Sequence, residues 1–148
     1  AKMLAGGEDI LYIARRLVIL ASEDIGLANP QALPITVAGL SAIKEIGMPE
    51  ARIILSEVAI YLAISPKSNS AYNAINSALN HIENEKIQEV PVHLTKIGAK
   101  DYKYPHDYEN HYVEQVYMNE KIKFYKFGEN KFEKAAEDWL KKIKKNQK

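Results

Sequence analysis

An all-α fold is predicted for this chain of 148 residues, and three observations predict it. Apolar side chains recur at helical spacing through the first 84 residues and again after residue 128. Glycine or proline stands where that period breaks, as is typical of helix ends and helix starts. The connections are short, which forces neighbouring helices to be antiparallel or strongly angled. We therefore expect one domain over 1–148, made of a compact helical array over 1–84, an irregular tyrosine-rich segment over 85–128 and a C-terminal amphipathic helix over 129–148.

The first helix is predicted from Ile10 to Asp24, with Asp9 as its N-cap and Gly26 as its stop. Three more helices should each begin at a proline, since the first helical turn does not need the missing N–H. Their expected starts are Pro30, Pro49 and Pro66, and their expected ends are Ile46, the residue before Ser65, and Asn84. Asn130 or Glu129 begins the last helix, whose apolar face holds Phe132, Ala135, Ala136, Trp139 and Leu140.

Charged residues near the end of the first helix form one candidate site. Arg15, Arg16 and Glu23 share one stripe of an otherwise apolar helix, and Asp24 lies just before the expected stop. They could form a catalytic or binding constellation, or they could hold the end of a buried helix. We favour the structural role, in which they pair with one another or with neighbouring helix ends. Breaking a buried pair costs about 3 to 5 kcal/mol, so Arg16→Ala is expected to lower the melting temperature or the oligomer content.

Pro66, Lys67, Ser68 and Asn69 form a second candidate site. Lys67 and Ser68 resemble the end of a phosphate-binding loop, but the sequence lacks the required glycines and a preceding strand. A helix N-terminus with a lysine beside it could still bind an anion or the carboxyl end of a neighbouring helix. The favoured interpretation is a specified helix start.

Five of the nine tyrosines fall between Tyr102 and Tyr117, in a segment without a sustained helical period. Tyrosine buries a large ring while keeping a polar tip, so we expect loop with short helical pieces that wraps the helical array. Residues 121–128 alternate weakly and are expected to form a short extended piece. Lysines interleaved with these aromatics, and five lysines among the last nine residues, keep open an interpretation in which the segment stacks on nucleic-acid bases.

Tyr104 precedes a short polar stretch that holds His106, Asp107, Glu109 and His111. A metal site is disfavoured because the two histidines are five residues apart, which fits neither a helical ligand pair nor a known zinc pattern. Loop histidines with ordinary structural contacts are the favoured alternative. A hydrolase that works through His106 and Asp107 has the weakest support, and no serine stands in a nucleophile-elbow motif.

The composition excludes several protein classes. Lysine and arginine number 20 against 19 Asp and Glu, so a formal net charge of +1 gives no overall electrostatic attraction to nucleic acid. The chain contains no cysteine, which excludes disulfides and thiolate zinc sites and fits a reducing compartment. No apolar run approaches the ~20 residues of a membrane helix, and the start shows no signal-sequence pattern. We expect a cytoplasmic protein without a membrane partner.

Four separated stretches carry a resemblance to a known family. They are GEDILYIARRLVILASEDIGLANPQAL, GMPEARIILSEVAIYLAISPKSNSAYNA, VPVHL and YKYPHDYENHYVEQVY. In this order they resemble the C-terminal region of the replication-associated recombination ATPases, the RarA or MgsA family, which is similar to the Werner helicase-interacting protein. Many members carry a longer insert before the last stretch, where this chain has only TKIGAKD, and Tyr117-Met118-Asn119 replaces their usual YLP.

The resemblance implies the helical collar domain by which clamp-loader subunits assemble, here into a homotetramer. It also implies a full-length AAA+ ATPase that acts on DNA ends, gaps or forks, associates with single-strand-binding protein, and is cytoplasmic at the nucleoid or replication fork. These 148 residues contain no Walker A or Walker B sequence, so ATP and Mg²⁺ are expected in an ATPase core outside this fragment. The resemblance transfers no catalytic, cofactor-binding or metal residue. The structural or interface candidates are Arg15, Arg16, Glu23, Asp24, Pro66, Lys67, Ser68, Asn69, Tyr104 and His106.

Overall fold

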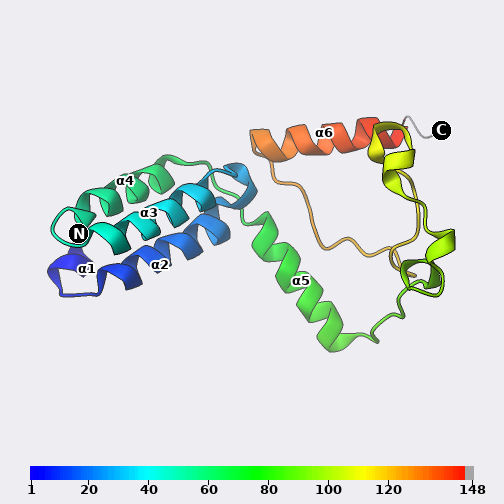
Figure 1. The fold of residues 1–148 in the computed structure, drawn as a ribbon, viewed down its shortest axis with the longest axis horizontal. Coiled ribbons are helices and arrows are strands. Elements are labelled where there is room, and N and C mark those ends of the chain that lie inside the picture. Colours follow the sequence, from blue (N-terminus) through cyan, green and yellow to red (C-terminus); the bar gives the residue numbers. More distant parts are fainter. Residues whose placement is uncertain (146–148) are drawn as a thin grey trace.

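The structure, a computed structural model, describes residues 1–145, and the end of the lysine-rich tail over 146–148 lies outside them. The described residues form helices and irregular chain without a strand, which confirms the all-α prediction (Figure 1). The helices are α1 (Lys2–Ala5), α2 (Ile10–Leu20), α3 (Ala32–Ile46), α4 (Ala51–Ile64), α5 (Ser70–Asn84) and α6 (Lys131–Lys145). No helix within residues 1–145 has both the length and the apolar character to cross a membrane.

Helices α2, α3 and α4 lie side by side and form a layer, with the short α1 next to it (Figure 1). Gly39 lets α3 approach α4 closely, because a Cβ at this position would lie 2.5 Å from Cγ2 of Val58. Full burial of an aliphatic side chain such as that of Val58 contributes about 1.5 to 3 kcal/mol to the stability of the fold. The layer therefore holds most of the core, in two clusters of buried side chains: Ala21, Ile25, Ala32, Val58 and Leu62, and Ala14, Ile43, Ala51 and Leu55.

The helix starts agree with the sequence prediction at α2 and at α6, where Lys131 directly follows the predicted start at Asn130. Asp9 caps α2, since its Oδ1 accepts a 2.7 Å hydrogen bond from the Tyr12 N–H. The three prolines do not begin helices, and α3, α4 and α5 start instead at Ala32, Ala51 and Ser70. Proline has a fixed φ, which also suits the turns and extended chain that reverse direction before a helix. The predicted starts at Pro30, Pro49 and Pro66 are therefore wrong by two to four residues.

The end of the first predicted helix is not a regular α-helix. α2 ends at Leu20, and Ala21–Ile25 continue as a π-helical turn. Such a turn holds one more residue than an α-turn and changes the direction of the groups that follow. Gly26 then stops the helix with φ at 48°, the left-handed conformation that glycine tolerates, as predicted.

Helices α5 and α6 leave one end of the layer and diverge from each other (Figure 1). Both contact the turns over 21–28 that follow α2. Within Ser70–Asn84 the single buried residue is Ser70, at the first turn, while α6 buries Glu133 and Ile143. The helical array predicted over 1–84 therefore divides into the packed layer and a projecting arm. On α6, Phe132 and Trp139 of the predicted apolar face stay exposed.

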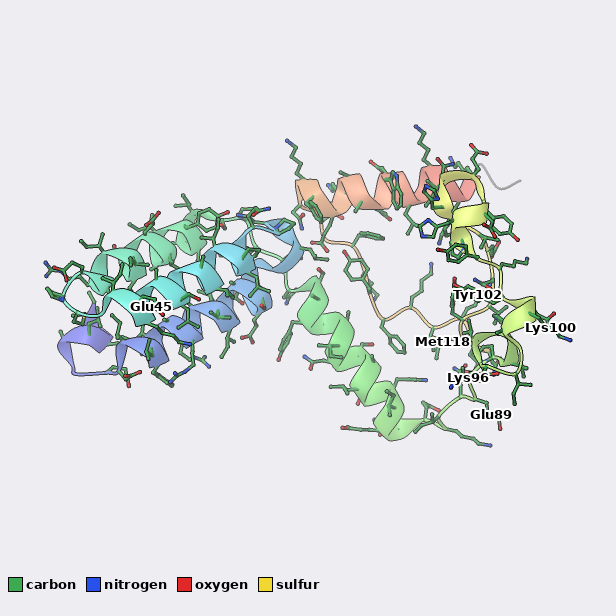
Figure 2. The ribbon with its side chains drawn as sticks, viewed as in Figure 1. Glu45, Glu89, Lys96, Lys100, Tyr102 and Met118 are labelled. Carbon is green, nitrogen blue, oxygen red and sulfur yellow. The ribbon has the colours of Figure 1, made fainter. Side chains whose placement is uncertain are left out.

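The tyrosine-rich segment does not wrap the layer. Figure 2 places Tyr102, Lys96 and Lys100 at the opposite end of the molecule from Glu45, which belongs to the layer. α5 carries the chain away from the layer before the segment begins, and this is why the prediction is wrong. The segment contains short 3₁₀ turns, and residues 121–128 form no strand. Its tyrosines stay 38 to 54% exposed at Tyr102, Tyr104, Tyr108 and Tyr117.

Candidate functional site

Residues 65–69 connect α4 to α5 at the point where the layer meets both arms, and we call them the 65–69 junction. Ser65 is buried, and its Oγ donates a 2.8 Å hydrogen bond to the Tyr61 carbonyl. Asn29, in the turn before α3, donates from Nδ2 to Tyr61 Oη at 2.8 Å and to Ser65 Oγ at 3.1 Å. These bonds join the start of α3 to the end of α4.

Lys67 closes the C-terminal end of α4. Its Nζ donates to the carbonyl oxygens of Leu62 at 2.6 Å and Ser65 at 2.9 Å. Carbonyls in the last turn of a helix lack partners within the helix and carry partial negative charge, which a lysine stabilises. The sequence prediction placed this lysine beside a helix N-terminus. α5 begins only at Ser70, so Lys67 stands before that helix and binds the carboxyl end of α4, which is one of the two roles expected for it.

Ser68 joins the 65–69 junction to the turn after α2. Its N–H donates a 2.8 Å hydrogen bond to the carbonyl of Asp24. The two chains approach so closely that a Cβ at Gly26 would lie 2.7 Å from the Ser68 carbonyl oxygen. Asn69 instead accepts a bond at Oδ1 from Asn73 in the first turn of α5. Two of the predicted candidates, Asp24 and Ser68, thus come together through the main chain.

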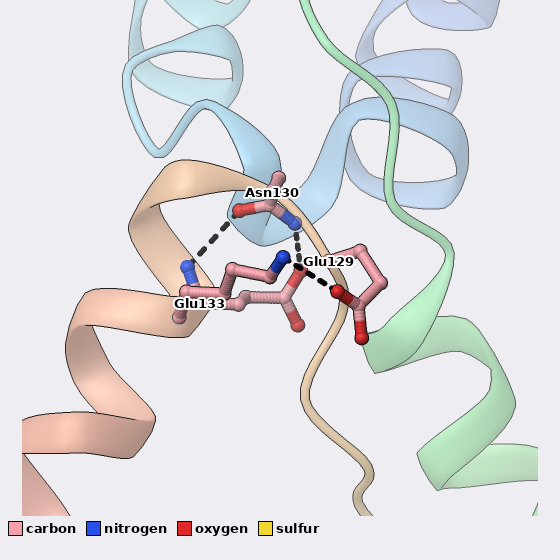
Figure 3. A network of polar contacts seen from close by, with 4 residues as sticks. Glu129, Asn130 and Glu133 are labelled. Atoms are coloured by element: carbon pink, nitrogen blue, oxygen red, sulfur yellow. Dashed lines mark hydrogen bonds and ion pairs between the residues drawn. The ribbon is translucent and has the colours of Figure 1, made fainter.

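Glu133, in the first turn of α6, is fully buried at 0% exposure and binds the same junction. Ser68 Oγ donates to its Oε2 at 2.6 Å, and Tyr125 Oη donates to its Oε1 at 2.7 Å. Asn130 caps α6 through a reciprocal pair of bonds with Glu133 (Figure 3): its Nδ2 donates to Oε2, and its Oδ1 accepts from the Glu133 N–H at 3.0 Å. The carboxylate therefore joins α6, the 65–69 junction and the segment before α6.

Neighbouring hydrogen-bond donors keep the Glu133 carboxyl ionised. Burial raises the pKa of this carboxyl, but hydrogen bonds from Ser68, Ser70, Tyr125 and Asn130 outweigh burial and lower the pKa to about 2. Burial, together with the hydrogen bond and the charge of Glu133, raises the pKa of Tyr125 to about 12. At neutral pH the site is an ionised carboxylate surrounded by neutral donors. We call Glu133 and its donors Ser68, Tyr125 and Asn130 the polar lock. The arrangement suits a structural role, because these donors are already directed at the carboxylate.

The charged stripe of α2 does not form the buried pairs that the sequence suggested. Arg15, Arg16 and Asp24 are exposed and Glu23 is partly exposed. Within residues 1–145 the ion pairs involve other groups, such as Lys134 with Glu129 at 2.6 Å. Long charged side chains lose little by staying in water, so an exposed stripe has no need of partners. The prediction that these residues pair in the interior is therefore wrong.

His106 and His111 come closer than their separation in sequence suggested. Their Nδ1 atoms lie 3.3 Å apart, and the Tyr104 ring lies 5.0 Å from the His106 ring. Asn110 and His111 have positive φ, which folds the chain back at this point. Across residues 1–145, no three His, Cys, Asp or Glu side chains are grouped so that they could hold a metal ion.

The 65–69 junction does not have the geometry of a phosphate-binding loop. Lys67 is the lysine that resembled a phosphate-binding loop, and its Nζ is directed at two main-chain carbonyls. Gly26 approaches the Ser68 carbonyl rather than an open anion site. No phosphate cradle of the kind that binds ATP is therefore built at the 65–69 junction.

Sequence reasoning missed Asn29, Tyr125 and Glu133 as parts of this site. Glu133 had a usable signal, because Asn130 and Glu133 have the spacing of a capping box. Nothing in the local sequence, however, indicates that the same carboxylate binds Ser68, which is 65 residues away along the chain.

Comparisons with known proteins agree with one another. The family model described as MgsA AAA+ ATPase C terminal matches residues 1–144. The Replication-associated recombination protein A of Bacillus subtilis is 43% identical over 98% of this chain and 37% of its own length. The ATPase WRNIP1 of Dictyostelium discoideum is 39% identical over 88% of this chain and 16% of its own length. The Replication-associated recombination protein A of Escherichia coli K12 is 34% identical over 82% of this chain and 30% of its own length.

The chain thus spans little more than a third, or less, of the curated relatives that it matches. The match nevertheless runs through the described helices and the tyrosine-rich segment, with both arms included. The chain belongs to the family of MgsA AAA+ ATPase C-terminal domains.

Proposed function

We propose that this chain is a single homo-oligomerisation module, a tetramerisation domain of the clamp-loader collar type, and is not itself an enzyme. The observation that carries the proposal is the amount of surface that the fold leaves exposed. The chain exposes 11044 Å², whereas a compact monomer of 16.7 kDa is expected to expose about 7,600 Å². The difference of about 3,400 Å² is several times the ~800 Å² that each partner of a standard interface buries.

Part of the exposed surface is formed by large apolar side chains of α4, which suit a contact between subunits. On α4, Ile53, Ile60 and Ile64 are exposed, and Ile64 is 78% exposed. Together with Tyr61 they line a shallow apolar surface. Exposed apolar side chains that gather in this way are candidates for a contact between subunits. A closed symmetric assembly would cover them on every subunit.

The wider setting of this module is proposed from the relatives. The names of these relatives indicate replication-associated recombination and ATPase activity. We infer that the module belongs to a clamp-loader-like AAA+ ATPase that maintains replication forks. In that protein, ATP and Mg²⁺ would bind an ATPase region that residues 1–148 do not contain. The partners would be DNA ends, gaps or forks and single-strand-binding protein, in the cytoplasm at the nucleoid or fork.

The proposal is tested by sedimentation of the chain at micromolar concentration. A species of about four times 16.7 kDa is expected, in exchange with smaller forms on dilution. Sedimentation as monomer alone, across the same range, would contradict the oligomerisation role.

A second candidate function, DNA binding by the tyrosine-rich segment, is favoured by the exposure of its aromatic rings. Tyr102, Tyr104 and Tyr108 are not covered by the layer, and lysines lie among them. A base stacked on such a ring contributes about 1 to 3 kcal/mol, so Tyr104→Ala should weaken single-stranded DNA binding about fivefold or more. The matched control is Tyr12→Ala, an exposed tyrosine of α2. Fluorescence anisotropy should show affinity that falls steeply with salt, and a flat titration at low salt would remove this candidate.

A further inference from the structure

Helix α5 carries an apolar row that stays about half exposed in the described part of the chain. Its members are spaced three, four and three residues apart, so they fall on one side of the helix. They are 46 to 54% exposed, although each belongs to a large apolar residue type: Tyr72, Ile75, Leu79 and Ile82. We call them the α5 seam. At its N-terminal end α5 contacts the turns over 21–28, near its buried Ser70. Near its C-terminal end the His81 ring lies 5.6 Å from the Phe124 ring, and Ile82, at the edge of the seam, lines a pocket with Phe124.

The remainder of α5 is also unusual for a helix surrounded by water. Residues 70–82 contain no Asp, Glu, Lys or Arg, and the first charged side chain is Glu83. Exposed helices normally carry charged residues opposite their apolar face. In α5 that place is taken by uncharged Asn and Ser, with Ala71, Ala74 and Ala78 next to the seam. Small neighbours allow close approach of a second helix, and the absence of charge removes repulsion between identical helices.

We infer that the α5 seam packs against the α5 seam of a second copy of this chain, with the two helices antiparallel. This inference rests on the proposed oligomerisation and names the surface that carries it. The direction follows from the fold, because the layer is attached at the N-terminal end of α5 (Figure 1). A parallel pair would bring both layers to the same end, whereas an antiparallel pair separates them. Antiparallel alignment also sets the opposite ends of the two helix dipoles side by side.

The antiparallel pairing defines which residues meet. The seam is symmetric about its centre, so Tyr72 lies opposite Ile82 of the second copy and Ile75 lies opposite Leu79. A contact of this kind is isologous, and each copy contributes the same residues. The spacing matches the packing of two helices along a shared apolar row.

The first test compares Leu79→Asp with Ser77→Asp by sedimentation. Leu79→Asp would place two unpaired carboxylates in each contact, so self-association should weaken about a hundredfold or more. Ser77 is exposed and lies two residues from both Ile75 and Leu79, which puts it on the other side of the helix. Ser77→Asp should therefore leave self-association unchanged. Circular dichroism checks that both variants keep their helices.

The results separate this inference from the proposed function. If the unmodified chain is monomeric, oligomerisation itself is wrong and the seam contact is wrong with it. If the unmodified chain is oligomeric and Leu79→Asp assembles as well as Ser77→Asp, oligomerisation stands and the seam contact is overturned. Weakening by Leu79→Asp alone supports the contact.

A second test uses the absence of cysteine from the chain, which makes introduced thiols the only ones present. Chains with Ile75→Cys and chains with Leu79→Cys, distinguishable by mass, are mixed and oxidised. Disulfides between the two kinds of chain are expected in preference to disulfides within one kind. A preference for Ile75→Cys with itself would overturn the antiparallel pairing. Cross-linking of Leu79→Cys to Ile60→Cys in place of Ile75→Cys would assign the seam to α4 of the second copy, and it would overturn the proposal.

Discussion

The layer of α2, α3 and α4 and the two arms α5 and α6 place their apolar side chains differently. In the layer, apolar side chains on neighbouring helices bury one another, and Ile25, Ala32, Ala51 and Leu62 are fully buried. In the arms, Ile75, Leu79 and Trp139 remain about half exposed. The layer is therefore folded by its own core, while the arms present apolar surface outward, although Ile143 near the far end of α6 is also buried.

A buried polar lock, rather than an apolar core, connects these two regions. Glu133 binds Ser68 and Tyr125, and the Ser68 main chain binds the turn after α2. A packed apolar contact tolerates small shifts, whereas a hydrogen-bonded carboxylate requires its donors at fixed positions. The lock therefore fixes the direction in which α6 leaves the layer. Substitutions and changes of pH can test the contrast between the layer and the arms.

Glu133→Ala should break the connection and have the largest effect. The change leaves the Ser68 and Tyr125 hydroxyls and the Asn130 amide without their acceptor, and it opens a cavity in a fully buried site. A loss of about 3 to 5 kcal/mol in the free energy of unfolding is expected in urea titrations. Amide exchange should rise in α6 and in the segment before it, while α2 and α3 stay protected.

The matched control for that variant is Glu129→Ala. Glu129 lies four residues before Glu133, and its side chain is 90% exposed in an ion pair with Lys134. Only a small change is expected because water screens this pair. If the two variants were equally stable, the carboxylate of Glu133 would not be the lock.

Leu62→Ala and Ile64→Ala compare the two sides of a single helix in the layer. Leu62 is 0% exposed and Ile64 is 78% exposed. Leu62→Ala is expected to cost about 2 to 5 kcal/mol, because it removes buried methyl groups and leaves a cavity. Ile64→Ala should change the stability of the monomer by about 0.5 kcal/mol or less. Thermal and urea unfolding under dilute conditions measure both, and equal losses would contradict the assignment of the core.

Acidification should weaken the lock without a mutation. The folded pKa of Glu133 is about 2, below its ordinary value of 4.5, so its contribution to stability is full above pH 4.5. That contribution is lost as the pH falls from 4.5 toward 2, since protonation then favours the unfolded chain.

For Tyr125 the folded pKa is raised from 10.0 to about 12, so its contribution to stability is full below pH 10.0 and is lost as the pH rises toward 12.

Urea titrations at a series of pH values measure this dependence. Glu133→Gln should flatten the acid limb of the stability curve, because the amide does not titrate. An acid limb of unchanged slope in this variant would assign the dependence to other carboxylates.

Arg16→Ala should have the smallest effect. From the sequence alone we expected a clear loss, on the assumption of a buried ion pair. The structure places Arg16 in water, so the expected change is about 0.5 kcal/mol or less in a thermal melt. Arg15→Ala is the matched variant, from the neighbouring exposed position. A large loss of oligomer in either variant, with unchanged monomer stability, would assign these arginines to a contact between subunits.

Local sequence signals predicted the elements whose causes are local. Asp9 accepts a hydrogen bond at its own helix start, and Gly26 and Gly47 have the positive φ that a helix stop requires. Each of these effects acts within a few residues, so it can be recognised in one stretch of sequence. The prolines misled because proline suits both the first helical turn and the turn before it.

The candidate site was only partly predictable, because its bonds join segments far apart in the chain. Lys67 and Ser68 were correctly singled out as residues of interest, but the carbonyls and the carboxylate that they bind come from elsewhere in the fold. The wrapping of the tyrosine-rich segment failed for a related reason. The apolar period indicates that α5 is a helix. It carries no information on the direction in which α5 runs from the 65–69 junction.

The π-helical turn at 21–25 makes the direction of the arms of this chain sensitive to its length at this position. This turn contains one residue more than regular helical winding would use. Deletion of Ser22 would restore the regular winding and rotate the Asp24 carbonyl by about a quarter turn or more, away from the Ser68 N–H. A chain shortened here would keep its apolar residues and the helix α2. The arms α5 and α6 would nevertheless leave the layer in a different direction. Length at this position is therefore constrained by geometry, even where the identity of the residue is not.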